Sequence, residues 1–358
     1  MRRAILLTSM PSPYMVELIE AVNATGRWQL IPLYENRSSQ GRRWSHSHLN
    51  HEHVFLDEKE CKAVAPYIKA ADLVVIGHLW GEACSAVLKQ QMRYSKPFVF
   101  WGERPGAVRR SLIANAIRPL LISRRFSHAK AVWGIGEWAV KEYKRCLPSV
   151  EVFANMPYAS NLEPYFNIPR DDEQSEGRPV RFLYSGSLIH RKGVDLLMPA
   201  FLKLVKEGHK ARLTLMGHGE LENRLISMIP QEYKGQINFI GFKEWHELPS
   251  VYAQHDILVA PSRYDGWGLI VVEGLASGMP VIATDMMGAT IDFVKQGENG
   301  WVALAGDGDA LYNILKEAVN AVLPRMRMKA RASVECWTLD KAAGRWCELA
   351  DTVLTKAI

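Results

Sequence analysis

Residues 256–285 constrain the fold more than any other part of the chain, because four structural signals follow one another there without interruption. The apolar run at 256–260 predicts a buried strand, which Pro261 and Ser262 end. Residues 264–268 include two glycines, which allow close approach of a backbone, and 269–277 predicts a helix that the Gly-Met-Pro at 278–280 ends. The order strand, loop, helix, strand predicts a parallel α/β sheet.

The loop between that strand and that helix is a predicted ligand site. In an open parallel sheet such a loop brings backbone N–H groups and a positive helix end to the edge where anions bind. Asp265 stands at the loop entrance, and Glu273 follows eight positions later, about two turns into the helix. Both carboxylates could flank one ligand and take its hydroxyls, which suits a nucleotide sugar. The alternative is that Glu273 is a solvated helix residue and Asp265 an ordinary turn former. The loop positions expected to contact the ligand are Gly266, Trp267, Gly268, Leu269 and Ile270.

The spacing of Asp265 and Glu273, followed by GMPVIATD at 278–285, resembles the donor-site signature of the retaining GT-B glycosyltransferases of family GT4. Most members have Glu at the first position. The Asp-Gly-Trp-Gly at 265–268, with Gly288-Ala289 further on, resembles a recurrent branch of the family. The resemblance implies an α/β GT-B fold, with two Rossmann-like parallel-sheet domains facing a central cleft. It also implies a nucleotide-sugar donor, no metal and no other cofactor, with Asp265 on the hexose and Glu273 on the ribose.

A second phosphate-binding loop is predicted at 186–193, directly after the strand expected at 181–185. Gly186 and Gly193 permit close backbone approach, while Arg191 and Lys192 bring positive charge to the start of a helix. In the family the Lys of Arg-Lys-Gly reaches the donor diphosphate and assists departure of the nucleotide. Lys192 matches that residue, and Arg191 is expected to assist it. The alternative for an isolated motif of this kind is a solvated turn.

A third loop follows the strand expected at 237–241. In the family the backbone just after that glycine reads the nucleotide base, so Phe242 and Lys243 are candidate donor contacts. Because backbone recognition leaves no mark in the side chains, the sequence does not distinguish a UDP-sugar from a GDP-sugar.

Length and composition bound the remaining organisation. A chain of 358 residues exceeds the size at which single cores stop growing, so two domains are expected. We place the acceptor domain at 1–166, completed by a C-terminal helix at about 338–358, and the donor domain at 167–337. No apolar run approaches the ~20 residues of a spanning helix, so a cytoplasmic protein is expected. Five cysteines without a Cys-x-x-Cys pair predict reduced thiols.

The amino-terminal half also alternates strands and helices, and its candidate acceptor residues follow the predicted strands. Ser12 and Tyr14 lie in the loop expected before a helix at 15–23, and Trp44 lies in the long polar loop at 35–53. His78 and Glu103 follow the strands at 72–77 and 97–101. Glu103 could accept the proton of the acceptor hydroxyl or balance charge at the anomeric carbon. The alternatives are a Glu103 paired with a nearby Arg and a His78 packed in the core. No Gly-x-Gly-x-x-Gly follows the first strand, which argues against an NAD-binding dehydrogenase.

The polar loop carries four histidines, His46, His48, His51 and His53. They could bind Zn²⁺ or Ni²⁺, but Cys and carboxylate partners at metal-site spacing are absent. Acceptor binding and a plain surface loop are the other two interpretations.

Charge is unevenly distributed along the chain. Residues 1–160 hold 22 Lys and Arg against 13 Asp and Glu, although the whole chain has a net charge of only +6. The segment from Arg104 to Lys130 contains seven basic residues and no acidic one, interleaved with apolar residues. Such a segment suits an anionic membrane surface or is the solvated face of a packed helix. Nucleic acid is not expected, because no recognition motif accompanies the charge.

These observations predict a retaining glycosyltransferase that transfers a hexose from a UDP- or GDP-sugar to a saccharide or lipid-linked acceptor. Cell-surface polysaccharide or lipopolysaccharide synthesis at the inner face of the cytoplasmic membrane would fit the basic first half. The predicted catalytic residues are Glu103, Lys192 and Asp265. The alternatives are a catalytically idle scaffold that binds a nucleotide sugar and, less favoured by the residues present, a sugar-nucleotide epimerase.

Overall fold

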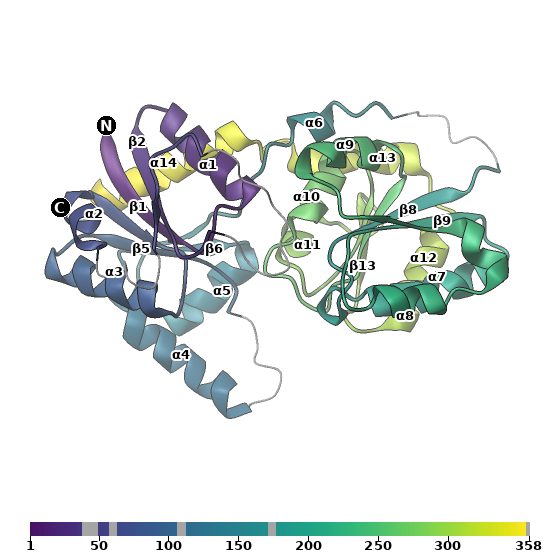
Figure 1. Ribbon diagram of the computed structural model, residues 1–358, viewed down its shortest axis with the longest axis horizontal. Coiled ribbons are helices and arrows are strands. Elements are labelled where there is room, and N and C mark those ends of the chain that lie inside the picture. Colours follow the sequence, from purple (N-terminus) through teal and green to yellow (C-terminus); the bar gives the residue numbers. More distant parts are fainter. Residues whose placement is uncertain (38–48, 57–62, 106–111, 171–176, 356–358) are drawn as a thin grey trace. The chain divides into compact units, whose positions relative to one another are not determined.

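The computed structural model describes residues 1–37, 49–56, 63–105, 112–170 and 177–355 (Figure 1). The chain folds into two compact units. Unit 1 comprises Met1–Asn161 and Trp337–Ile358, and unit 2 comprises Leu162–Cys336. Each unit is built on a parallel sheet, which confirms the predicted α/β fold.

The sheet of unit 1 has, within the described residues, seven strands in the order β3-β2-β1-β4-β5-β6-β7. All its pairs are parallel, and β1 lies at the point where the strand order reverses. The strands are β1 (Arg2–Thr8), β2 (Trp28–Tyr34), β3 (Val54–Phe55), β4 (Leu73–Ile76), β5 (Phe98–Glu103), β6 (Ala131–Ile135) and β7 (Phe153–Asn155).

Both faces of this sheet are covered, which is why its central strands are almost continuously apolar. Helices α2 to α5 share one hydrophobic core with alternate residues of the strands, such as Ile31 and Phe100. On the other face Trp28 packs against Trp346 of the C-terminal helix α14. The helices are α1 (Pro13–Ala24), α2 (Ala65–Ala70), α3 (Glu82–Arg93), α4 (Leu112–Phe126), α5 (Glu137–Cys146) and α14 (Leu339–Thr355).

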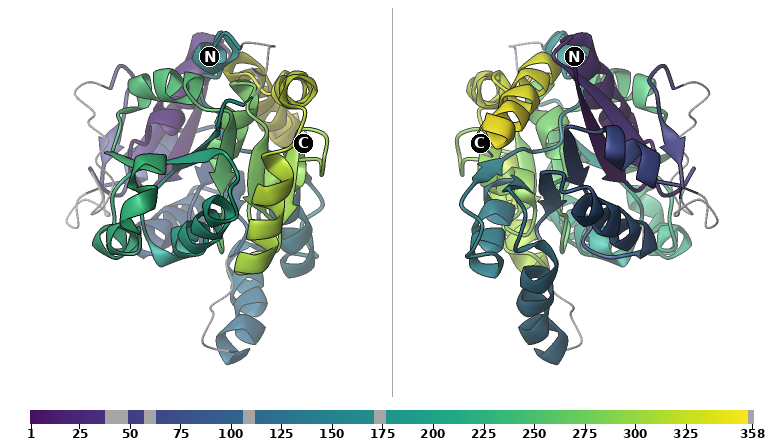
Figure 2. Two further views of the ribbon diagram at one scale, coloured as in Figure 1. Left: turned by 90° about the vertical axis from the view of Figure 1, so that its right-hand side faces the viewer. Right: turned by 90° about the vertical axis from the view of Figure 1, so that its left-hand side faces the viewer.

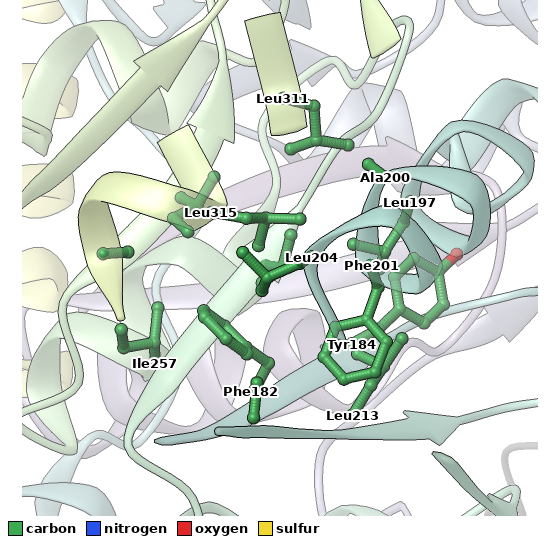
Figure 3. Packing of buried hydrophobic residues seen from close by; sticks show 14 of the residues in the cluster. Phe182, Tyr184, Leu197, Ala200, Phe201, Leu204, Leu213, Ile257, Leu311 and Leu315 are labelled. Carbon is green, nitrogen blue, oxygen red and sulfur yellow. The ribbon is translucent and has the colours of Figure 1, made fainter. Parts of the chain in front are cut away.

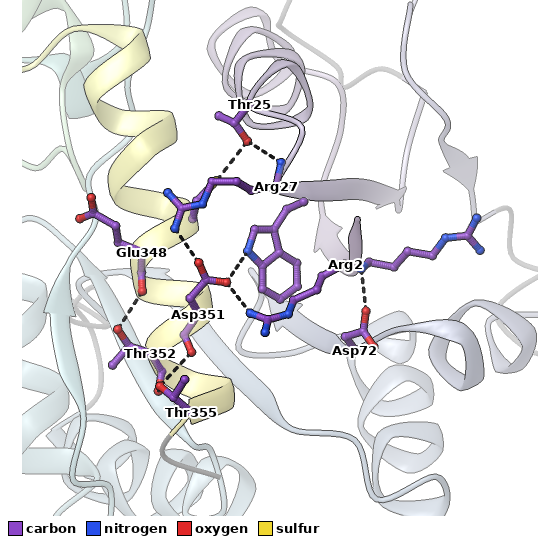
Figure 4. Close-up of polar contacts among 11 residues, drawn as sticks. Arg2, Thr25, Arg27, Asp72, Glu348, Asp351, Thr352 and Thr355 are labelled. Carbon is purple, nitrogen blue, oxygen red and sulfur yellow. Dashed lines mark hydrogen bonds and ion pairs between the residues drawn. The ribbon is translucent and has the colours of Figure 1, made fainter. Parts of the chain in front are cut away.

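Helix α14 belongs to unit 1 although it comes last in the sequence, and it runs beside the first helix and strands (Figure 2). Asp351 attaches it: the carboxylate accepts hydrogen bonds from Arg2 at 2.7 Å, from Arg27 at 2.5 Å and from the Trp28 indole at 3.0 Å (Figure 4). These bonds join the end of the chain to β1 and β2.

Unit 2 contains, in the described residues, a six-stranded parallel sheet of order β10-β9-β8-β11-β12-β13. Its strands are β8 (Val180–Ser185), β9 (Ala211–Met216), β10 (Ile237–Gly241), β11 (Ile257–Ala260), β12 (Val281–Thr284) and β13 (Gly300–Ala303). Its helices are α6 (Glu163–Phe166), α7 (Val194–Lys206), α8 (Glu222–Ser227), α9 (Leu248–Ala253), α10 (Leu269–Ala276), α11 (Gly288–Phe293), α12 (Gly308–Ala318) and α13 (Leu323–Val334), with short 3-10 turns at His190–Lys192, Gln231–Gln236 and Trp245–Glu247.

The core of unit 2 lies between the sheet and helices α7 and α12. Phe182 and Tyr184 of β8 meet Phe201 of α7 there, and Leu315 of α12 packs into the same cluster (Figure 3). At the amino end of β11 the buried Asp256 carboxylate accepts hydrogen bonds from Arg178, Arg181 and Arg327. Burial opposes ionisation, but the bonds from Arg181 and Arg178 hold the pKa of Asp256 at about 2.

Two predicted element boundaries in unit 1 were wrong. Helix α1 begins at Pro13 rather than Met15, so Tyr14 lies in the first turn of a helix and not in a loop. Proline suits the first helical position, since its missing N–H has no intrahelical partner there. Glu103 is the last residue of β5 rather than the residue after a strand. In the part of the chain that is described, no helix is both long and apolar enough to span a bilayer.

Candidate active site

Backbone hydrogen bonds made by glycines connect the loops at the carboxyl ends of β8, β9 and β10. Gly217 donates its N–H to the Gly241 carbonyl at 2.8 Å, and Gly186 donates to the Met216 carbonyl at 3.0 Å. A Cβ on Gly217 would lie 2.1 Å from the Gly186 carbonyl oxygen, so a side chain there would separate the two loops. The glycines thus allow the loops at this edge of the sheet to pack backbone against backbone, and their contact with a ligand stays a prediction.

The second predicted phosphate-binding loop, residues 186–193, ends at Gly193, which contacts the loop after β11. Gly193 has φ 73°, and a Cβ on it would lie 1.9 Å from the Pro261 carbonyl oxygen. Helix α7 starts at the next residue, so its positive amino end lies at this contact. Only glycine allows the two backbones to approach this closely.

The loop before α10 is held by its own backbone. Asp265 pairs with Met287 in a single parallel bridge, and the buried Trp267 ring packs on Phe293 at a centroid distance of 5.9 Å. Gly268 has φ 88°, and helix α10 begins directly after it. The first N–H groups of α10 therefore point to the carboxyl edge of the sheet without intrahelical partners.

The two predicted loops meet through an ion pair. Lys192 Nζ lies 2.5 Å from Asp265 Oδ2, and both side chains are largely buried. Arg191 donates from Nη1 to the Tyr264 carbonyl at 3.0 Å. The structure thus brings together two residues that are 73 positions apart in the sequence.

Arg263 strengthens the same contact and was not predicted from the sequence. Its guanidinium forms two hydrogen bonds with Asp195 of α7, at 2.6 and 2.8 Å, and a third with the His190 carbonyl at 2.6 Å. A bidentate pair of this kind is geometrically specific. Arg263 comes two residues before Asp265, but nothing in a single sequence links it to Asp195.

Glu273 is the fifth residue of α10, so it lies just over one turn into the helix and not two as expected. The reason is that Asp265 is outside the helix, in the bridge to Met287. Tyr252 of α9, which is fully buried, donates its hydroxyl to Glu273 Oε2 at 3.2 Å. Burial, with the nearby Glu273 charge, raises the pKa of Tyr252 well above its usual value, so the hydroxyl remains a donor. The sequence did not indicate Tyr252.

The candidate base contacts, Phe242 and Lys243, follow β10 and are partly buried. Lys243 Nζ pairs with Glu247 Oε1 at 3.1 Å. Their expected role is recognition of the nucleotide base through the backbone that follows Gly241, and this role stays a prediction.

In unit 1, Ser12, His78 and Glu103 lie at the carboxyl ends of three adjacent strands, β1, β4 and β5. Ser12 is buried and precedes α1, while Tyr14 packs on Tyr158 at a centroid distance of 4.9 Å. The Glu103 carbonyl accepts a hydrogen bond from Tyr143 at 2.6 Å. Trp44 lies outside the described residues.

Of the four histidines considered for metal binding, His46 and His48 lie outside the described residues. His51 is buried and its Nε2 lies 3.0 Å from the Tyr34 hydroxyl, and His53 Nδ1 bonds the His51 carbonyl. Across the described ranges no group of three His, Cys, Asp or Glu side chains is placed to hold a metal ion.

Comparison with known families identifies the unit that carries the two loops. Residues 167–334 match the family model of the glycosyl transferases group 1. The matched segment is just under half of the 358-residue chain and lies within unit 2. The resemblance found in the sequence is thereby confirmed, while the Asp-Gly-Trp-Gly branch stays a prediction.

Curated proteins from different organisms are similar to part of this chain. An uncharacterized glycosyltransferase of Methanocaldococcus jannaschii is 32% identical over 156 residues, which are 44% of this chain and 43% of that protein. The capsular polysaccharide biosynthesis glycosyltransferase CapM of Staphylococcus aureus is 28% identical over 137 residues, 38% of this chain and 36% of CapM. The chain therefore spans less than half the length of these curated relatives.

A solved structure similar to the whole chain confirms the fold. The crystal structure of HepE from Anabaena, in complex with UDP, has a TM-score of 0.77 and 16% sequence identity, and the match covers 98% of this chain and all of HepE. The chain thus has the two-domain GT-B fold that the sequence predicted.

Proposed function

We propose that this chain is a retaining hexosyltransferase that uses a UDP- or GDP-sugar and needs no metal or other cofactor. The observation that carries the proposal is the Lys192–Asp265 ion pair at 2.5 Å, which joins the two glycine loops at the amino ends of α7 and α10. A cation and two helix amino ends at one sheet edge suit a diphosphate.

In this proposal Lys192, Arg191 and the amides of 267–270 hold the diphosphate and stabilise the leaving group. Electrostatic stabilisation of developing charge is commonly the largest contribution to catalysis. Glu273 takes the ribose hydroxyls, and Asp265 takes a hexose hydroxyl when the diphosphate draws Lys192 away. Glu103 of unit 1 accepts the acceptor proton or balances charge at the anomeric carbon, and Phe242 and Lys243 contact the base.

The relatives support the choice of donor and pathway class. HepE was solved with UDP, and CapM is named for capsular polysaccharide biosynthesis. We extend both to this chain: the acceptor is a saccharide or lipid-linked saccharide of a cell-surface polysaccharide or lipopolysaccharide.

Helix α4 supports a lipid-linked acceptor at an anionic membrane surface. Its Leu120 is 70% exposed, with Ile117 and Leu121 also exposed, and the side chains of Arg118 and Arg124 accompany them. Exposed leucines beside arginines suit the interface of an anionic bilayer, where each basic residue contributes on the order of 1 kcal/mol. Sedimentation with phosphatidylglycerol vesicles but not with phosphatidylcholine vesicles is the expected result, with loss of binding in Leu120→Ser. Equal sedimentation with both would contradict this part of the proposal.

The donor proposal is tested by thermal shift and calorimetry with UDP, GDP, ADP and their sugars. A ligand at 100 times its Kd adds roughly 2.7 kcal/mol to the stability of the folded state. We expect one nucleoside diphosphate and its sugars to stabilise the wild type. The same ligands should stabilise neither Lys192→Ala nor Glu273→Ala. Lys316→Ala and Glu207→Ala, which break an ion pair on the surface of the same unit, are the matched controls and should respond like the wild type.

Activity separates a transferase from an idle scaffold. A transferase releases nucleotide from the bound sugar slowly without acceptor, and faster with one. Binding without any release over hours would identify a scaffold, and absence of binding to every nucleotide would refute the donor site.

A further inference from the structure

Helices α9 and α10 carry Tyr252 and Glu273, and the Arg170 guanidinium lies at the carboxyl ends of both helices. Helices α6, α9, α10 and α13 pack together in unit 2 (Figure 1). The last carbonyl groups of a helix have no intrahelical partner, so they need donors from elsewhere when they lie inside the protein. Arg170, which follows α6 in the chain, supplies donors at both helix ends.

The Arg170 guanidinium donates to backbone carbonyls of two helix ends. At the end of α9, Nη2 donates to the Tyr252 carbonyl at 3.1 Å and Nη1 donates to the His255 carbonyl at 2.5 Å. At the end of α10, Nε donates to the Ser277 carbonyl at 2.7 Å. Burial lowers the pKa of Arg170 to about 10, so the side chain is still charged at neutral pH. Because the guanidinium is a rigid planar fork, these bonds fix the distance between the two helix ends.

The chain next to Arg170 is itself held in place. Arg331 of α13 donates to the Ile168 carbonyl, two residues before Arg170. Gly278, which follows the end of α10, has φ 74°, and a Cβ on it would lie 3.0 Å from Arg331 Nε and 3.5 Å from Arg170 Cγ. Both arginines therefore pass close to the end of α10. Arg170 consequently has little room to follow a displaced helix.

One helical turn connects this contact with the predicted ribose ligand, Glu273. The Ser277 N–H donates to the Glu273 carbonyl at 2.9 Å, so the carbonyl that Arg170 bonds is one turn from Glu273. On α9, Arg170 bonds the carbonyl of Tyr252, whose hydroxyl donates to Glu273 Oε2 at 3.2 Å. That hydroxyl bond is already long, so a small further separation of the two helices would break it.

We propose that Arg170 is a positioning residue, which joins the carboxyl ends of α9 and α10, keeps the Tyr252 hydroxyl on Glu273 and so orients that carboxylate toward the ribose of a nucleotide sugar. The inference rests on the proposed function in naming the ribose, whereas the joining of the two helices follows from the contacts within unit 2 alone. Because Arg170 acts through Tyr252, its loss should reduce ribose discrimination no more than loss of the Tyr252 hydroxyl does.

The test uses the full chain and the variants Arg170→Met, Arg170→Lys, Tyr252→Phe and the double variant Arg170→Met/Tyr252→Phe. Calorimetry measures the Kd of the nucleoside diphosphate that the wild type prefers among UDP, GDP and ADP, and of its 2′- and 3′-deoxy analogues. Urea unfolding measures the stability of each variant. Arg178→Lys is the matched control, because it weakens an ion pair of the same unit, 2.9 Å from Arg178 to the buried Asp256. If Arg170→Met does not fold, Arg170→Lys is combined with Tyr252→Phe in its place.

We compare the ratio of the Kd of a deoxy analogue to the Kd of the natural nucleotide. This ratio should fall about fivefold in Arg170→Met, as in Tyr252→Phe, and by less in Arg170→Lys, which keeps the charge but not the fork. The double variant should also fall about fivefold, rather than the roughly 25-fold of two independent effects, because both substitutions remove the same interaction. Arg178→Lys should be less stable than the wild type and keep its ratio.

The inference is overturned if Arg170→Met lowers stability but keeps the wild-type ratio, since Arg170 would then only stabilise unit 2. It is also overturned if the effects of Arg170→Met and Tyr252→Phe on the ratio multiply. If no nucleotide binds the wild type, the donor proposal fails, and the free energies of unfolding decide the positioning. Non-additive free energies for Arg170→Met and Tyr252→Phe would then support the joining of the two helices, and additive ones would overturn it.

Discussion

Tyr252→Phe removes one hydroxyl that the structure places on Glu273, and it tests the donor site without touching any predicted ligand contact. The Tyr252 hydroxyl donates to Glu273 Oε2 at 3.2 Å and also bonds Ser185, the residue before the Gly186 loop. The Tyr165 ring packs on the Tyr252 ring at a centroid distance of 5.3 Å. The phenol is therefore held by both neighbours and orients the carboxylate.

The magnitude follows from the bond length. A hydrogen bond to a charged group contributes about 1.5–3 kcal/mol and a neutral one about 0.5–1.5 kcal/mol. The 3.2 Å separation is long for an O–H···O bond, so we take about 1 kcal/mol, which corresponds to roughly a fivefold change in affinity.

Calorimetry with the preferred nucleoside diphosphate and its 2′- and 3′-deoxy analogues measures that change. If Tyr252 orients Glu273 toward the ribose, Tyr252→Phe weakens the natural nucleotide about fivefold and leaves at least one deoxy analogue unaffected, so discrimination falls. Tyr312→Phe is the matched control, because Tyr312 donates to Glu207 at 2.5 Å in the same unit. The reasoning is refuted if Tyr252→Phe retains the discrimination of the wild type, or if both analogues weaken as much as the natural nucleotide.

Three further predictions concern stability. Gly193→Ala should lower the melting temperature and abolish nucleotide binding, because the added Cβ would lie 1.9 Å from the Pro261 carbonyl oxygen. Gly26→Ala is the control and should keep nucleotide binding intact, because Gly26 has a similar φ of 67° but nothing within 4 Å of the added Cβ. The lowered pKa of Asp256 contributes about 2 kcal/mol to the free energy of unfolding, and this contribution is present above pH ~4 and lost as the pH falls toward 2. In Asp256→Asn, acid titration should therefore show no loss of stability from this group. Asp351→Asn should destabilise unit 1 by about 1–2 kcal/mol in urea melts without changing nucleotide binding, and an unchanged midpoint would contradict the attachment of α14.

Much of the fold could be predicted because the signals were local. The strand at Ile237–Gly241 has the expected bounds, and the strand expected at 181–185 begins one residue earlier, at Val180. The glycines predicted close backbone approach, and Gly193, which has a positive φ, does lie against the backbone of Pro261. The errors occurred where a boundary depended on a single residue, as at Pro13, or on a non-local bridge, as at Asp265.

The partners of the candidate site were not predictable in the same way. Arg263 and Asp195 are 68 positions apart, and Tyr252 reaches Glu273 from a different helix. Pairing of side chains across such distances depends on the topology of the sheet.

The sequence by itself determined the alternation of strands and helices, the two glycine loops and the residue types at their ends, because periodicity and backbone freedom are properties of neighbouring residues. Only the tertiary structure decided which of those residues meet. Parallel strands bring their carboxyl ends to one edge whatever their separation along the chain, so Lys192 comes to lie against Asp265, Tyr252 against Glu273, and the C-terminal helix against the first strand.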